Sequence, residues 1–280
     1  MSSDCLVIDD VDAALAAMTP LGRAVSAAAA ESVRTVILDF AERRGWRTVR
    51  YETFMNWAQR IVVARTTLQW LVLDPLFVIH NGSRHVERFR IGRIAGTNSF
   101  ACGADQVPSR TATTAILDDA AASGSTLRFV ASRVRATGGR VAQVVLCAST
   151  REAKRNAGLA PHAGWTDFLP GDWQILHLRD GCAHLPFAGR RAPMQDEALG
   201  VDVRLPALSA GGSIWQSLGL IPSIRAAIVN ARRFVLDRIE AELGRPAIVD
   251  DLRLLGDRVP CHIMVGQEVS AHTPLNSLLT

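Results

Sequence analysis

Lysine is almost absent from this sequence: of 31 basic residues only Lys154 is a lysine, and the others are arginines. The net charge is +4 over 280 residues, which is a modest excess. Such a balance does not by itself indicate nucleic-acid binding, so we expect no nucleic-acid partner. Arginine also serves phosphate ligands, because its planar guanidinium donates several hydrogen bonds at once.

Paired cysteines and long apolar runs are missing as well. The five cysteines contain no CxxC pair, which argues against a structural zinc site. They are Cys5, Cys102, Cys147, Cys182 and Cys261. Their odd number and the lack of a leader sequence favour a reducing, cytoplasmic location. The apolar run over residues 70–79 is short and is broken by Asp74 and Pro75, so no membrane span is expected.

The positions of apolar residues predict both helices and strands. Helical periodicity is present over residues 11–44, 51–72 and 222–243. The run "PLFVIH", residues 75–80, predicts a short strand that ends at Asn81-Gly82. Residues 114–148 follow the pattern strand, loop, helix, strand, which is the unit that builds parallel sheets.

These patterns predict an α/β fold in three consecutive segments. Residues 71–191 would form a core with a parallel sheet. A helical extension over residues 1–70 would precede it, and a mainly helical extension over residues 192–280 would follow.

The stretch "AILDDAAASGSTL", residues 115–127, combines two chemistries. Ligands of open parallel sheets bind at the carboxyl ends of strands, and a loop of small residues before a helix lets backbone N–H groups approach an anion. Ser123, Ser125 and Thr126 add hydroxyl donors. Asp118 and Asp119 would repel phosphate but suit the vicinal hydroxyls of a ribose, so a ribose 5-phosphate satisfies both halves. The alternative is that the two acids cap a turn or the helix and that the loop binds nothing.

This stretch resembles the phosphoribosyl-pyrophosphate (PRPP) loop of type I phosphoribosyltransferases, and the resemblance covers roughly residues 114–148. It departs from the family at Ala120 and Ala121, where large aliphatic residues are usual. A Walker motif and a GxGxxG motif are both absent. The resemblance implies that Asp118 and Asp119 bind the ribose hydroxyls. It also implies that the following segment binds the 5-phosphate, through Ala121, Ala122, Ser123, Gly124, Ser125 and Thr126.

Position 122 bears on the acceptor of such an enzyme. Family members that act on 6-oxopurines have an Asp there, and this chain has Ala122. The lysine that those members place on the purine oxygen has no good counterpart, since Lys154 is the only lysine. The resemblance therefore implies an adenine-like or other acceptor rather than hypoxanthine or guanine.

Two further parts of such an enzyme have candidates. Asn81, Gly82 and Ser83 with Arg84 would form the pyrophosphate loop, although an Asn-Gly pair is commonly only a turn. Residues 168–191 resemble the hood that covers the base in such enzymes. There Trp173 would stack on the acceptor, and Asp180 or a nearby carbonyl would bond its edge; the alternative is a core tryptophan. Arg110 or Arg93 would close over pyrophosphate.

The resemblance thus implies PRPP-dependent phosphoribosyl transfer to a nitrogen nucleophile, a nucleobase or a related small molecule, with release of pyrophosphate. Asp118, Asp119 and Arg84 would be the catalytic residues. Mg²⁺ would be bound mainly through PRPP, and a homodimer is expected. The alternative from another class is a phosphoribosyltransferase-like protein that binds PRPP or a nucleotide as a regulator without catalysis. A specialised biosynthetic role outside nucleotide salvage is a third possibility.

Overall fold

The structure is a computed structural model of the chain. It describes residues 5–74, 76–77, 86–89, 91–93, 100–102, 113–179, 193–196, 201–204, 221–248, 251, 263–264, 267–268 and 272–278.

The chain divides into two compact units, which differ from the three consecutive segments expected from the sequence. One unit comprises Met1–Val49, Arg93–Ser99 and Leu176–Thr280, and the other comprises Arg50–Gly92 and Phe100–Ile175. The two ends of the chain share a unit because a helix from each end packs against the other.

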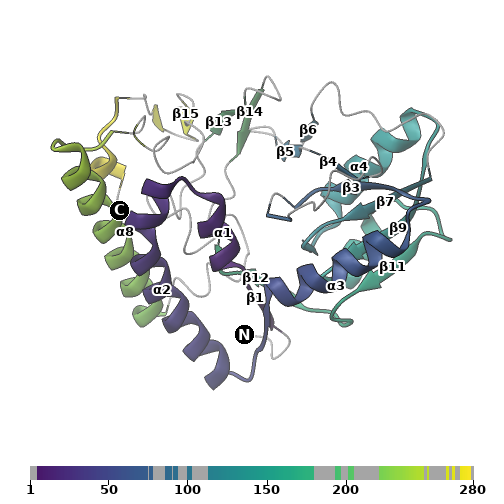
Figure 1. The fold of residues 1–280 in the computed structure, drawn as a ribbon, viewed down its shortest axis with the longest axis horizontal. Coiled ribbons are helices and arrows are strands. Elements are labelled where there is room, and N and C mark those ends of the chain that lie inside the picture. Colours follow the sequence, from purple (N-terminus) through teal and green to yellow (C-terminus); the bar gives the residue numbers. More distant parts are fainter. Residues whose placement is uncertain are drawn as a thin grey trace. The chain divides into compact units, whose positions relative to one another are not determined.

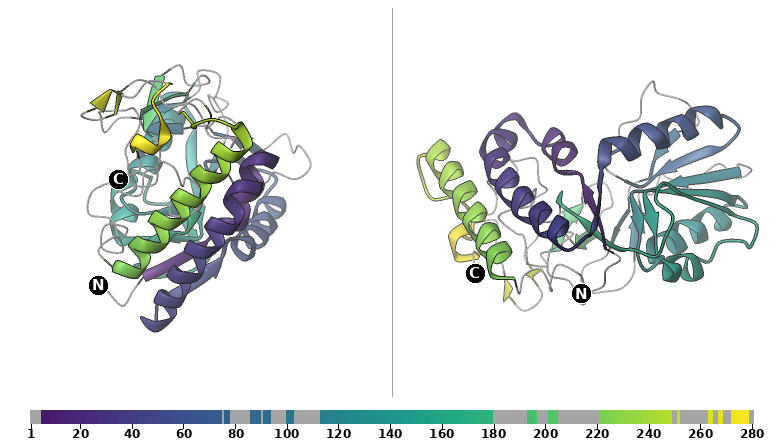
Figure 2. Two further views of the ribbon diagram at one scale, coloured as in Figure 1. Left: turned by 90° about the vertical axis from the view of Figure 1, so that its left-hand side faces the viewer. Right: turned by 90° about the horizontal axis from the view of Figure 1, so that it is seen from below.

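The first unit is built on two long helices, α2 (Pro20–Arg43) and α8 (Pro222–Leu243), which lie along each other (Figures 1 and 2). The side chain of Thr19 caps α2 by accepting a hydrogen bond from Gly22 N–H at 3.0 Å, and Pro20 suits the first helical position. Both long helices confirm the predicted helical periodicity.

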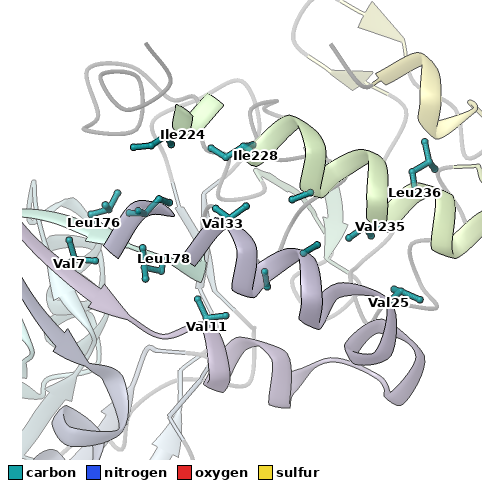
Figure 3. Close-up of a cluster of buried hydrophobic side chains, with 14 of the residues drawn as sticks. Val7, Val11, Val25, Val33, Leu176, Leu178, Ile224, Ile228, Val235 and Leu236 are labelled. Atoms are coloured by element: carbon teal, nitrogen blue, oxygen red, sulfur yellow. The ribbon is translucent and has the colours of Figure 1, made fainter. Parts of the chain in front are cut away.

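The core of this unit lies between α2 and α8. Valines of α2, such as Val25 and Val33, are buried in it, as are Ile228 and Val235 of α8 (Figure 3). The short helix α1 (Val11–Ala17) packs on α2. A three-stranded sheet of order β12-β1-β2 adds Val7 and Leu176; its strands are β1 (Cys5–Asp9), β2 (Arg47–Arg50) and β12 (Gln174–His177).

Several short elements lie outside the long helices and the larger sheet. They are the antiparallel pair β13 (Pro193–Asp196) and β14 (Val201–Arg204), the antiparallel pair β15 (Ile263–Met264) and β16 (Gln267–Glu268), the pair β5 (Ile91–Arg93) and β6 (Phe100–Cys102), and the 3₁₀ turn η3 (Leu275–Leu278).

The second unit contains a five-stranded sheet in which every neighbouring pair is parallel. In spatial order its strands are β11 (Gly164–Asp167), β9 (Arg140–Leu146), β7 (Thr113–Leu117), β3 (Gln69–Val72) and β4 (Val86–Arg88). In the right-hand view of Figure 2 the sheet lies between α3 (Tyr51–Ala64) and α4 (Ser125–Ala136). The expected α/β class with a parallel sheet is therefore correct, and so is the predicted strand, loop, helix, strand unit.

The first strand of this sheet lies earlier in the chain than the sequence predicts. The predicted helix over residues 51–72 ends at Ala64, and the strand is β3 at Gln69–Val72. Of the strand expected over residues 75–80, only Leu76 and Phe77 are described, and neither is in a strand. Trp70, Leu71 and Val72 are buried on both faces of the sheet, so β3 has no polar alternation that would have identified it.

The strand order places a topological switch point between β3 and β7. The chain passes from β3 to its neighbour β4, returns to β7 on the other side of β3, and continues outward to β9 and β11. In open α/β sheets, ligands bind at the carboxyl ends of the strands where the direction of winding reverses. The carboxyl ends of β3 and β7 therefore define the place where a ligand of this unit is expected.

Candidate functional site

The carboxyl end of β7 carries the paired acids at this switch point. Asp118 N–H donates to the Val145 carbonyl at 3.1 Å, which keeps the chain in register with β9. Asp118 is half-buried and Asp119 is buried, at 7% exposure. The Asp118 carboxylate accepts from Asp119 N–H at 3.1 Å, and the Asp119 carboxylate accepts from Ala120 N–H at 2.6 Å. Both acids therefore accept hydrogen bonds within the turn, which is the capping role expected from the sequence as the alternative to ribose binding.

Ala120 and Ala121, where the sequence departs from the family, form the short strand β8 (Ala120–Ala121). It pairs in parallel with β10 (Ala148–Ser149), which directly continues the chain beyond β9. Cys147 N–H donates to the Asp119 carbonyl at 2.8 Å, and Thr150 N–H donates to that of Ala121 at 3.0 Å. The acids are thus held between two hydrogen-bonded ladders, which makes this stretch of backbone rigid.

The loop that follows is exposed and leads into a long helix. Ala122 and Ser123 are exposed, and Gly124 has the left-handed conformation, with φ at +75°. Ser123 Oγ and Ser125 Oγ are 2.8 Å apart. The twelve-residue helix α4 begins at Ser125 and has no acidic residue in its first turn. Its first N–H groups and the serine hydroxyls are donors of the kind that bind an anion, and their binding of a 5-phosphate stays a prediction.

The neighbouring strand end, after β3, supplies an acid, Asp74, that was not among the predicted site residues. Asp74 is 1% exposed and accepts hydrogen bonds from the Tyr51 hydroxyl and from Leu76 N–H, the latter at 2.9 Å. Tyr51 is the only tyrosine of the chain and starts α3. Leu73 N–H bonds the Leu117 carbonyl at 2.8 Å, so Asp74 and Asp118 follow adjacent strand ends. The available signal was an acid placed directly after an apolar run, residues 70–73.

The candidate hood, residues 168–191, begins directly after β11 and is described as far as residue 179. Trp173 is half-buried, so it is not a fully buried core residue. Its indole is folded over Gly171, where an added Cβ would lie 2.4 Å from the indole Nε1. Stacking of Trp173 on an acceptor stays a prediction.

Several predicted site residues lie outside the described part of the chain. They are Asn81, Gly82, Ser83 and Arg84 of the pyrophosphate loop, Asp180 of the hood, and Arg110. Arg93, the other candidate for closing over pyrophosphate, is the last residue of β5. Among the described candidates, Asp118 and Asp119 lie at the end of β7, and the predicted phosphate loop, residues 121–126, leads from them into α4.

Among the described residues, no three His, Cys, Asp or Glu side chains converge in a way that could hold a metal ion. None of the helices in the described ranges is long and apolar enough to cross a membrane.

Comparisons with known proteins give a weak likeness in fold. No protein-family model and no curated protein matches the chain. Part of the chain resembles adenine phosphoribosyltransferase from Saccharomyces cerevisiae, solved with D-2,5-dideoxy-2,5-imino-altritol 1,6-bisphosphate and adenine, at 12% identity and a TM-score of 0.30. The match covers 42% of this chain and 77% of that one. A second adenine phosphoribosyltransferase matches at 14% identity and a TM-score of 0.27, covering 45% of this chain and 77% of that one. At these values the likeness does not assign the chain to a family.

Proposed function

We propose that the site around Asp118 binds the ribose 5-phosphate part of PRPP and that the protein transfers this phosphoribosyl group to a nitrogen nucleophile. One observation carries the proposal. At the switch point of a parallel sheet, two rigidly held carboxylates are followed directly by an exposed hydroxyl-bearing loop at the start of a helix. Few ligands other than a sugar phosphate need acceptors for their hydroxyl groups and, beside them, hydrogen-bond donors for their phosphate.

Each half of the site has a separate task. The carboxylates of Asp118 and Asp119 would accept hydrogen bonds from the 2- and 3-hydroxyls of ribose. Donors from Ala122 to Thr126 would hold the 5-phosphate. The bond from ribose C1 to pyrophosphate then breaks, the nitrogen lone pair forms the new bond to C1, and the acceptor releases a proton. Positive charge builds on the ring as pyrophosphate leaves, so the protein contributes by positioning the sugar and by stabilising charge.

The donor set at this site fits magnesium. Carboxylate oxygens are the ligands that Mg²⁺ prefers, and Mg²⁺ is commonly held largely by phosphate oxygens of a substrate. The half-buried Asp118 would be its protein ligand, with the remaining oxygens coming from PRPP. When bound, the ion would neutralise charge on the leaving pyrophosphate.

The proposal is tested by calorimetry and by pyrophosphate release. Asp118→Asn should weaken PRPP binding by at least about tenfold, because charge-assisted hydrogen bonds to a carboxylate contribute about 1.5–3 kcal/mol. Asp237→Asn, which changes an exposed carboxylate of α8, is the matched control and should bind normally. An unchanged affinity in Asp118→Asn would overturn the assignment of the ribose site.

Turnover is tested with magnesium, PRPP and a panel of nucleobases and small amines. Pyrophosphate release should require an acceptor, and hypoxanthine and guanine should be poor acceptors because Ala122 stands where the family's 6-oxopurine members have an Asp. Binding of PRPP without release across the whole panel would favour the regulator that binds without catalysis.

A further inference from the structure

The short helix α5 (Arg151–Asn156) lies between the phosphate loop and the segment that carries Trp173, and it is bonded to both. On the loop side, the Thr150 hydroxyl donates to the carbonyl of Ala122 and accepts from Ala153 N–H at 2.9 Å. Gly124 lies so close to α5 that a Cβ there would be 2.5 Å from the Ala153 carbonyl oxygen. The start of α5 is therefore fixed by the same loop that would hold the 5-phosphate.

The other side of α5 is bonded to the segment of residues 167–173. Arg151 N–H donates to Asp172 Oδ1 at 2.9 Å, next to Trp173. Lys154 Nζ lies 2.7 Å from Asp167 Oδ2, and the Asp167 side chain is only 3% exposed. Ser149 also donates to the Asp167 carboxylate, at 2.8 Å. These bonds tie the strand end of β11, and the turn before Trp173, to α5.

We propose that α5 couples binding of the sugar phosphate to the position of the Trp173 segment, with Thr150 and Asp172 as the positioning residues. A helix of six residues is not stable by itself in water, so its position depends on the groups that bond its two sides. Phosphate binding would order the exposed residues Ala122 and Ser123 and, through Thr150, the start of α5. The acceptor would then bind to a Trp173 segment that the first ligand has already ordered. It would lose no free energy in ordering that segment, so the two ligands would bind cooperatively. This inference rests on the proposed function.

The test is hydrogen exchange measured by mass spectrometry, with ribose 5-phosphate as the ligand and ribose as the ligand that lacks the phosphate. In the unmodified protein, ribose 5-phosphate should slow exchange by about fivefold both in residues 120–127 and in residues 167–175, the scale of ordinary coupling between sites. Ribose alone should leave residues 167–175 unchanged, because it does not engage the phosphate loop.

Thr150→Val removes the hydroxyl at constant shape and should keep the slowing in residues 120–127 while losing it in residues 167–175. Thr150→Ser should restore it. Thr137→Val is the matched control: Thr137 is also half-buried, and its hydroxyl donates to the Val134 carbonyl at 2.8 Å, at the carboxyl end of α4. Asp172→Ala, at an exposed position, removes the acceptor of Arg151 N–H and gives the same test if Thr150→Val does not fold.

The possible results separate this inference from the proposed function. Slowing confined to residues 120–127 in the unmodified protein, or a Thr150→Val protein that responds like the unmodified one, would overturn the coupling and leave the sugar-phosphate site standing. No slowing in residues 120–127 at saturating ribose 5-phosphate would overturn the proposed function, and the coupling with it.

Discussion

A single methyl group added at Gly124 should destabilise the protein strongly. Its φ of +75° lies in the left-handed region, and a Cβ there would meet three backbone atoms of α5 and its end. These are the Ala153 oxygen at 2.5 Å, the Ala153 Cα at 3.0 Å and the Ala157 nitrogen at 3.1 Å. The backbone of a packed helix moves aside less easily than a flexible side chain does. Gly124→Ala can therefore be accommodated only if the loop or α5 shifts, which costs free energy of folding.

The size of the effect follows from two separate costs. A non-glycine residue in the left-handed region costs about 1–2 kcal/mol. Forcing a methyl group into closely packed backbone adds about 1–3 kcal/mol. Gly158→Ala is the matched control in the same unit: φ is +63°, but the nearest atom is the flexible Arg128 Cγ at 3.4 Å. The control should show only the conformational cost of about 1–2 kcal/mol.

The assay is guanidinium chloride denaturation followed by tryptophan fluorescence, with the free energies of unfolding compared at a common slope. Four of the six tryptophans belong to the unit concerned: Trp57, Trp70, Trp165 and Trp173. If Gly124→Ala loses no more stability than Gly158→Ala, the phosphate loop is not pressed against α5, and the coupling proposed above loses one of its contacts.

Three further results are expected. Tyr51→Phe should lower the free energy of unfolding by about 1–3 kcal/mol in denaturant titration, because it removes a donor from the buried carboxylate of Asp74; an unchanged stability would show that this bond contributes nothing. Hydrogen bonds from Arg245 hold the pKa of Asp251 below its ordinary value of 3.8, so Asp251→Asn should lower Tm at neutral pH, and the difference should shrink as pH falls below 3.8; a difference that grows in acid would contradict this. Trp173→Ala should raise the KM of an aromatic acceptor about fivefold and that of PRPP less, since a lost stacking contact costs about 1 kcal/mol; loss of folding would indicate a structural tryptophan.

The parts of the fold that could be predicted from the sequence are those with local periodicity. The apolar stripe of α2, with Val25 and Val33, repeats at helical spacing, and the unit from β7 to β9 alternates apolar strands with an amphipathic helix. β3 could not be placed, because Ala64 is followed by no Gly or Pro that would mark the end of α3. The packing of α2 on α8 joins segments almost two hundred residues apart along the chain, and no local pattern records it.

The candidate site divides in the same way. The place of Asp118 and Asp119 at a strand end followed from the sequence, since an apolar run ends directly before them. The burial of Asp119 did not, because it depends on β10 lying beside Ala120 and Ala121. The ion pair between Lys154 and Asp167 could not be predicted from the sequence either, because it depends on the parallel pairing of β9 with β11.

The two halves of the site also differ in rigidity, and this bears on the chemistry proposed for them. Asp118 and Asp119 sit between the ladders of β7 with β9 and of β8 with β10, whereas Ser123 lies in the exposed loop. The reacting carbon of PRPP, C1, is bonded to the carbon that carries the ribose 2-hydroxyl. Groups that hold the diol must therefore be in place when the bond to pyrophosphate breaks, whereas groups that contact the distant 5-phosphate need only bind it. Asp118→Asn should therefore lower kcat as well as raise the KM for PRPP, and Ser123→Ala should raise the KM by about tenfold or less with kcat unchanged. An unchanged kcat in Asp118→Asn, measured by steady-state pyrophosphate release, would show that this carboxylate acts only in binding.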